Sequence, residues 1–88
     1  MAVYMVERNL PGIQIDQLAA AQKAAIATGE DMTAKGKKVR YIRSTFVPGD
    51  SRCMCLFEAN DQTAVKELND TAKIPYTRIV EALDLTPR

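Results

Sequence analysis

The stretch Arg52-Cys53-Met54-Cys55-Leu56-Phe57-Glu58-Ala59 decides the fold of this chain. Its residues favour an extended strand, in which successive side chains point to opposite faces. Two apolar side chains fall on one face and three on the other: Met54 and Leu56, then Cys53, Cys55 and Phe57. A strand that is apolar on both faces is expected at the centre of a sheet, covered on both sides.

The residues before this stretch predict its hairpin partner. Val39–Val47 is rich in β-branched and aromatic residues, and the Pro48–Ser51 segment that follows it is a turn signal. Ala2–Asn9 and Arg78–Leu85 predict two further strands near the ends of the chain. The segment 76–83 also fits a helix, because its Glu, Ala and Leu residues occur in both states.

A long helix is predicted between the first two strands. Asp16 is its expected N-cap, and good helix formers continue from there to Lys35. Residues at spacings of three and four form its expected buried stripe: Leu18, Ala21, Ala25, Thr28 and Met32. Gly29 predicts a bend within this helix, and Gly36 is its expected C-terminal glycine.

A second helix is predicted after the central strand, with Asp61 as N-cap and an end near Lys73. The resulting order is β-α-β-β-α-β, which is typical of a ferredoxin-like sandwich: a four-stranded antiparallel sheet with two helices on one face. Two helices leave the other face of the sheet open. Because the central strand is apolar on that face too, we expect a homodimer of the α+β-barrel kind.

The bulk composition limits the classes of function. The chain has 88 residues, which predicts one domain spanning residues 1–88, and its 12 basic and 11 acidic residues give a net charge of +1. No clustered basic excess indicates nucleic-acid binding, and no apolar run approaches the length that spans a membrane. With no signal-peptide pattern, we expect a soluble cytoplasmic protein whose cysteines are reduced.

The sequence contains no histidine. This absence excludes Ser-His-Asp and Cys-His catalysis and histidine-based zinc sites. Cys53 and Cys55 supply only half of a four-ligand soft-metal site, so burial as small apolar residues is the favoured interpretation.

Six residues are candidates for a ligand-binding site. Glu7, Glu58 and Glu81 lie in predicted strands, where a buried carboxylate has a raised pKa or needs a partner. If all three faced the open side of the sheet, they could bind a cation or act as a base. Tyr41 and Arg43 are expected on one face of their strand, where they could bind an anion or where Arg43 could pair with a strand glutamate. Cys55 completes the set.

Three segments carry a family resemblance: YMVERNLPG at 4–12, the hairpin from Ser44 to Ala59, and IPYTRIVE at 74–81. In this order they resemble a small bacterial ferredoxin-like family of uncharacterised function, one member of which is described as a nickel-binding protein. The resemblance implies a ferredoxin-like fold, a dimer and a divalent metal as one ligand.

The matching positions are Glu7, Cys55, Glu58 and Glu81. Arg43 stands where the family commonly has histidine, and Asn60 replaces a proline. Arginine cannot ligate nickel, because it stays protonated and has no lone pair to offer.

Three functions are consistent with these observations. The leading hypothesis is a dimeric binding protein of unknown ligand, a small molecule or a metal, whose pocket lies at the sheet. The alternative is a small cofactor-free enzyme of the dimeric α+β-barrel class, such as a cyclase, isomerase or oxygenase, with a carboxylate as its base. The third is a metal-binding protein that uses carboxylates and Cys55.

Overall fold

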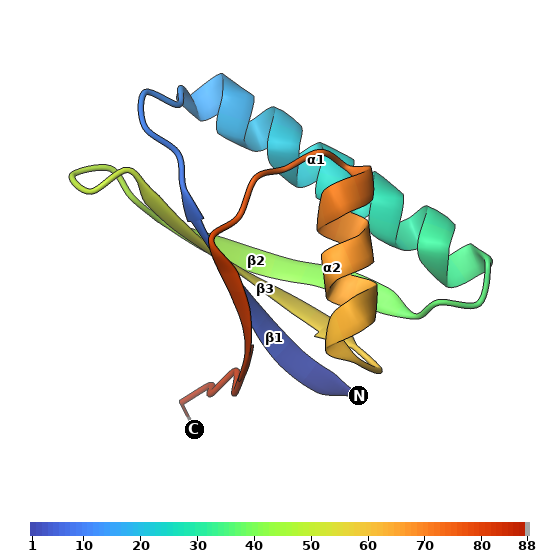
Figure 1. Cartoon of the computed structure of the whole chain (residues 1–88). Coiled ribbons are helices and arrows are strands. Elements are labelled where there is room, and N and C mark those ends of the chain that lie inside the picture. The colour runs from blue at the N-terminus through green and yellow to red at the C-terminus, as the bar shows by residue number, and fades with distance from the viewer. Residues whose placement is uncertain (88) are drawn as a thin grey trace.

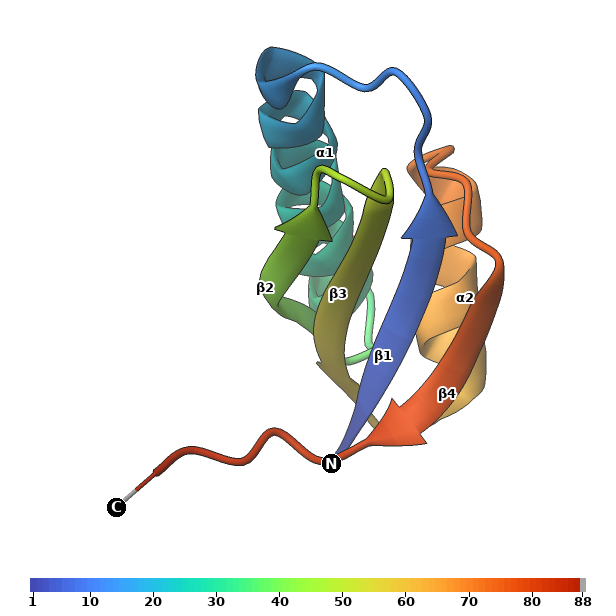
Figure 2. The same ribbon diagram turned by 90° about the vertical axis from the view of Figure 1, so that its left-hand side faces the viewer.

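The chain follows the predicted β-α-β-β-α-β order in the computed structural model, which describes residues 1–87 (Figure 1). The strands are β1 (Ala2–Asn9), β2 (Val39–Val47), β3 (Arg52–Ala59) and β4 (Arg78–Ala82), and the helices are α1 (Ile15–Ala34) and α2 (Gln62–Thr71). All strand pairs are antiparallel, in the order β2-β3-β1-β4. Figure 2 shows both helices behind the sheet and the other face uncovered. This arrangement confirms the ferredoxin-like prediction.

The alternation in β3 produces the two predicted faces. β3 is an inner strand between β2 and β1. Cys53, Cys55 and Phe57 are buried beneath the helices, and Phe57 is completely inaccessible. Met54 and Leu56 lie half-buried on the open face of the sheet. The main core therefore lies on the helix side, and the open face carries a second, thinner apolar layer.

The start of α1 differs from the prediction. The N-cap is Gln14, not Asp16, and the helix begins at Ile15. The backbone N–H of Gln14 donates to Oε1 of Gln17 at 2.8 Å, which satisfies a donor that the helix leaves free. Asp16 lies in the first turn, where its negative charge interacts favourably with the helix dipole and stabilises α1. At the other end Gly36 has φ +97°, as expected for a terminating glycine.

Gly29 permits a close approach of α1 to the sheet. A Cβ atom at this position would lie 3.2 Å from the carbonyl oxygen of Val39, at the start of β2. Gly29 is buried together with Ala25 and Met32, two members of the predicted stripe. Close packing against β2 therefore accounts for this glycine.

The second half of the chain follows the prediction until β4. Oδ1 of Asp61 accepts from the backbone N–H of Ala64 at 2.8 Å, which confirms the N-cap of α2. Residues 78–82 form a strand, so the helical alternative for this segment is wrong. β4 ends at Ala82 and not at Leu85, because Ala82 pairs with Val3 and β1 offers almost no strand beyond that point.

A β-bulge in β2 overturns one prediction. Tyr41 pairs with Phe57 and Arg43 pairs with Leu56, so Ile42 is an extra residue in the ladder. The bulge turns Tyr41 toward the helices and Arg43 toward the open face. The expectation that Tyr41 and Arg43 share one face is therefore wrong.

Candidate functional site

The structure divides the six candidate residues between two faces and an edge. Glu7, Arg43 and Glu58 belong to the open face, because their ladder partners Met54, Leu56 and Val3 lie there. Tyr41 and Cys55 lie beneath the helices. Glu81 pairs with Tyr4, on the helix side of the sheet, and is exposed on the edge strand β4. The three glutamates therefore do not converge on one face.

Glu7 is held in an ion-pair cluster on the open face. Its carboxylate contacts Nη2 of Arg52 at 3.1 Å and also pairs with Nε of Arg78. The hydrogen bond from Arg78 is the largest cause that lowers the pKa of Glu7 below its ordinary value. A carboxylate with two guanidinium partners is a stabilised anion, and its environment does not suit a general base with raised pKa.

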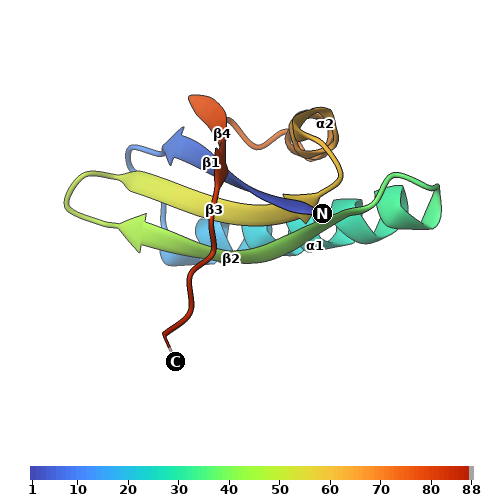
Figure 3. The ribbon, with the colours of Figure 1, turned by 90° about the horizontal axis from the view of Figure 1, so that it is seen from below.

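The other open-face candidates are paired as well. Glu58 contacts Arg40 at 3.3 Å, and Arg43 pairs with Asp84 of the C-terminal segment. This segment leaves β4 and crosses the open side of the sheet toward β2 (Figure 3). Arg43 therefore forms an ion pair, as one of its two alternatives expected, but its partner is an aspartate outside the strands and not a strand glutamate.

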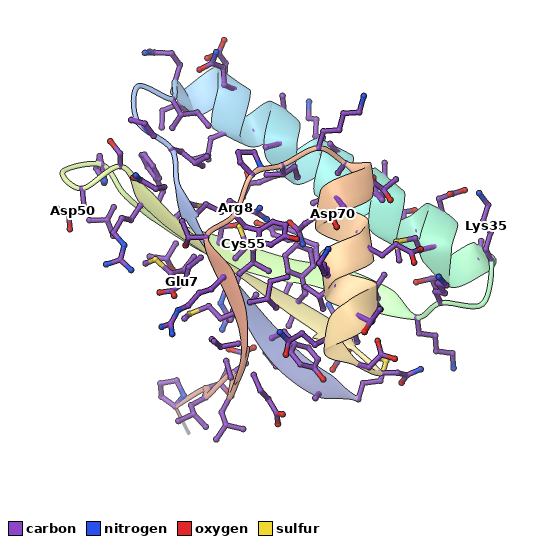
Figure 4. The ribbon with its side chains drawn as sticks, viewed as in Figure 1. Glu7, Arg8, Lys35, Asp50, Cys55 and Asp70 are labelled. Carbon is purple, nitrogen blue, oxygen red and sulfur yellow. The ribbon has the colours of Figure 1, made fainter. Side chains whose placement is uncertain are left out.

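A buried polar cluster on the helix side is the most unusual feature of the molecule. Arg8 on β1 is 4% exposed. Its Nε donates to Sγ of Cys55 at 3.3 Å, and its Nη2 donates to Oδ1 of Asn69 at 2.5 Å. Nη1 donates to the carbonyl oxygens of Ile74 and Pro75 at 3.5 and 3.2 Å. Figure 4 shows Arg8 and Cys55 between the sheet and the helices, with Glu7 on the other side of the sheet.

The cluster continues from Cys55 toward α1. Oγ of Ser44 lies 2.9 Å from Sγ of Cys55 and 2.6 Å from the hydroxyl of Tyr41. Nε2 of Gln22 on α1 donates to the same hydroxyl at 2.8 Å. One hydrogen-bonded path thus joins α1, β2, β3, β1 and α2 through their side chains.

The two thiols lie side by side and are free. Their sulfur atoms are 3.7 Å apart on the same face of β3. Burial is the main cause that raises the pKa of Cys53 to about 11, and the neighbouring Cys55 adds to it. Cys53 is therefore a neutral thiol at physiological pH, as predicted for a buried apolar residue.

A small cavity adjoins this cluster, between α1 and the sheet. The space open to the centre of a water molecule is about 20 Å³, and the cavity is partly open to solvent. Its lining residues are Arg8, Leu10, Leu18, Ala21, Gln22, Ala25, Tyr41, Ser44, Cys53, Cys55 and Ile74. This volume is enough for one ordered water molecule or one small polar group.

The alternation of residues in β1 indicates that Arg8 is buried, although its charge suggests exposure. Tyr4, Val6 and Arg8 alternate in β1, so Arg8 shares the face of two buried residues. Asn69 lies next to the buried Leu68 in α2 and is also fully buried. Glu7 and Arg8 are adjacent in the sequence and therefore face opposite sides of the sheet.

The fold and the buried cluster define a ferredoxin-like α+β protein with a polar interior site beside its central strand. The chain belongs to the family of nickel responsive proteins described as SCO4226-like, which matches residues 4–82. The crystal structure of SCO4226 from Streptomyces coelicolor A3(2) superposes with a TM-score of 0.82, at 24% sequence identity, covering 97% of this chain and 100% of that one. No match is found among curated proteins. No helix within residues 1–87 has the length and apolar character needed to cross a membrane.

The side chains do not fit a nickel ion within one chain. Among residues 1–87, no three His, Cys, Asp or Glu side chains are grouped as a metal would require. The sequence has no histidine, and Arg43 turns away from Cys55 to the open face. The guanidinium of Arg8 also lies against Cys55, where its positive charge opposes a bound cation.

Proposed function

We propose that this protein is a small homodimeric binding protein that takes up its ligand in the cavity between α1 and the sheet. The observation that carries the binding function is the polar cluster beside that cavity. Arg8, Tyr41, Ser44 and Gln22 line this space, and a chain of hydrogen bonds through Cys55 joins them. A buried polar network of this kind is costly to maintain, which is the reason for assigning it a binding role.

The open face supports the homodimer. Apolar side chains from three strands lie there half-buried: Val3, Met5, Met54, Leu56 and Val80. A stable interface buries about 800 Å² on each partner, roughly one seventh of the 5663 Å² surface of this chain. A second copy would cover these side chains, and the ion pairs around them leave no open-face candidate carboxylate without a partner.

Light scattering coupled to size-exclusion chromatography tests the dimer. We expect a mass twice the 9.7 kDa of the chain, and half that mass for Leu56→Glu, which places a charge in the centre of the open face. Ile26→Glu is the matched control, because Ile26 is 44% exposed on α1, on the other side of the molecule. A wild-type protein that remains monomeric at high concentration would contradict the dimer.

A thermal-shift screen tests the binding function. A ligand that binds only the folded chain raises the melting temperature in proportion to the logarithm of its excess over Kd. Nickel, zinc and manganese belong in this screen because of the family. We expect no rise with these metals, since residues 1–87 of one chain contain no grouped set of three metal ligands. A rise at excess metal would show that two copies assemble a site together.

No observation favours the enzyme alternative with a carboxylate base. The residues that line the cavity include no Asp or Glu, Glu81 is exposed at the edge, and Glu7 is a stabilised anion. A base would have to come from another part of the assembly.

A further inference from the structure

Cys53 and Cys55 place two sulfur atoms side by side in the interior of the chain. Both side chains point to the helix side of β3, and their Sγ atoms lie 3.7 Å apart. They are the only cysteines in the sequence, and both are free. A zinc or nickel ion needs further ligands, which residues 1–87 do not group around them. A two-coordinate ion needs none beyond these two sulfurs.

Arg8 carries a buried positive charge that no carboxylate balances. Its side chain is 4% exposed, and its acceptors are two carbonyl oxygens, an amide oxygen and the sulfur of Cys55. None of the ion pairs within residues 1–87 includes Arg8. Burial of an uncompensated charge is costly, so a negatively charged group at Cys55 would stabilise the folded chain.

The other hydrogen bonds of the cluster also end at Cys55. Oγ of Ser44 donates to its Sγ at 2.9 Å, so in the 2.6 Å bond between Ser44 and Tyr41 the tyrosine hydroxyl is the donor. That hydroxyl accepts in turn from Gln22 at 2.8 Å. Donors therefore reach the sulfur from two sides, the second being Nε of Arg8 at 3.3 Å. Hydrogen bonds of this kind favour a thiolate over a thiol and hold a metal ligand in place.

The charge of the ion decides whether Arg8 is neutralised. Two thiolates and one monovalent ion form a complex with one net negative charge, which the guanidinium balances. Two thiolates and a divalent ion form a neutral complex, which leaves the charge of Arg8 as it was. The guanidinium that opposes nickel thus favours a monovalent ion. Thiolates select soft ions, of which copper(I) is the monovalent one that proteins bind.

The space at the two sulfurs suits a single ion. A metal–sulfur bond is about 2.3 Å long, so an ion bound to both sulfurs spans their 3.7 Å separation at a bent angle. Both cysteines line the small cavity beneath α1, which is partly open to solvent and has room for one water molecule. An ion reaches the sulfurs through this opening, and it uses their lone pairs and not the donors of the network.

We propose that Cys53 and Cys55 bind one copper(I) ion per chain as a pair of thiolates, with the guanidinium of Arg8 balancing the charge of the complex. Binding forms one copper–sulfur bond at each cysteine, and each thiol proton goes to solvent. Copper enters and stays in the monovalent state, so no electron is transferred. This assignment rests on the binding function proposed above and names its ligand. It does not depend on the dimer, whose mass is measured separately.

Anaerobic titration of the reduced chain with copper(I), in competition with a chromophoric copper(I) chelator, measures the stoichiometry and the affinity. We expect one ion per chain and, in X-ray absorption at the copper edge, two sulfur neighbours. Cys53→Ala and Cys55→Ala should each abolish the competition with the chelator. Met54→Leu is the matched control: Met54 lies between the two cysteines in the sequence but on the open face of the sheet, so this variant should bind copper as the wild type does.

Asn69→Asp tests the charge balance, because it places a carboxylate oxygen where Oδ1 of Asn69 lies, 2.5 Å from Nη2 of Arg8. With Arg8 already neutralised, the copper complex brings an unbalanced negative charge into the interior. The copper(I) affinity should therefore fall at least about tenfold although both sulfurs remain. Asn60→Asp makes the same chemical change at an exposed residue and should leave the affinity unchanged. Circular dichroism spectra establish that each variant is folded.

Several results would overturn the proposal. One is a wild-type chain that leaves all copper(I) with the chelator, and another is undiminished binding in either cysteine variant, which would place the copper elsewhere. Unchanged affinity in folded Asn69→Asp would show that Arg8 does not balance the complex. Nickel or zinc bound at the two cysteines as tightly as copper(I) would show that the site does not select a monovalent ion. If copper(I) does not bind but a compound in the thermal-shift screen does, the binding function stands and only this ligand is wrong.

Discussion

Replacing Asn69 with alanine removes the side-chain oxygen on which the buried guanidinium of Arg8 depends. Asn69 is fully buried, and its Oδ1 accepts from Nη2 of Arg8 at 2.5 Å. Its Nδ2 donates to the carbonyl oxygen of Val65 at 2.8 Å, one turn earlier in α2. In Asn69→Ala, that N–H of Arg8 is left without its partner on a side chain that is almost wholly buried.

The expected cost follows from the chemistry of this contact. A hydrogen bond to a charged group contributes about 1.5–3 kcal/mol to stability. Alanine recovers roughly 0.5 kcal/mol through its higher helix propensity at this position in α2. The carbonyl of Val65 loses only an additional donor. The net loss is therefore about 2 kcal/mol, which for a domain of this size lowers the melting temperature by about 8–16 °C.

Circular dichroism melts and urea titrations measure this loss, and Asn60→Ala is the control on an exposed residue. The urea midpoint should fall while the m value stays the same, because the extent of unfolding does not change. A decrease in melting temperature no greater than that of the control would refute the reasoning. Such a result would mean that water reaches Arg8 and that its burial carries little cost.

Three further predictions concern packing and pH. Gly29→Ala should destabilise the chain by about 1 kcal/mol in urea titrations, since the contact of the new Cβ with the oxygen of Val39 outweighs the gain in helix propensity; a higher midpoint would contradict the close packing. The lowered pKa of Glu7 means that its contribution is present above its ordinary value of 4.5 and is lost as pH falls further, so the acid slope of stability should be smaller in Glu7→Gln. If both proteins lose stability equally in acid, the pairing with Arg78 has no effect. The pKa of Cys53 rises from 9.0 to about 11 on folding, so the wild-type chain should lose stability between these pH values relative to Cys53→Ala. A constant difference between the two melting temperatures from pH 9.0 to 11 would show that this thiol does not titrate there.

The fold was predictable because local signals agreed with one another. Alternation in 52–59 identified a central strand with two apolar faces, and Asp61 marked the start of α2 through its capping oxygen. The boundary of β4 was not predictable in the same way. The end of β4 depends on where its partner strand β1 begins, and residues 83–85 themselves carry no signal for it.

The candidate site was harder to predict because it depends on contacts that are distant in the sequence. Arg8 meets Cys55 and Asn69 across separations of 47 and 61 residues. The bulge at Ile42 has no glycine or proline to signal it, yet it decides which face Arg43 occupies. A single extra residue in β2 thus placed Tyr41 and Arg43 in different environments.

The two faces of the sheet differ in whether their charged side chains have partners of opposite charge. On the open face, Glu7, Glu58 and Arg43 each have a partner of opposite charge. Covering paired charges with another protein surface costs less than covering unpaired ones, which agrees with a contact between copies of the chain. On the helix side Arg8 is buried with neutral acceptors only. The proposed second subunit would therefore cover a face whose charges are already paired, and the buried cluster of Arg8 would remain on the opposite side of the sheet.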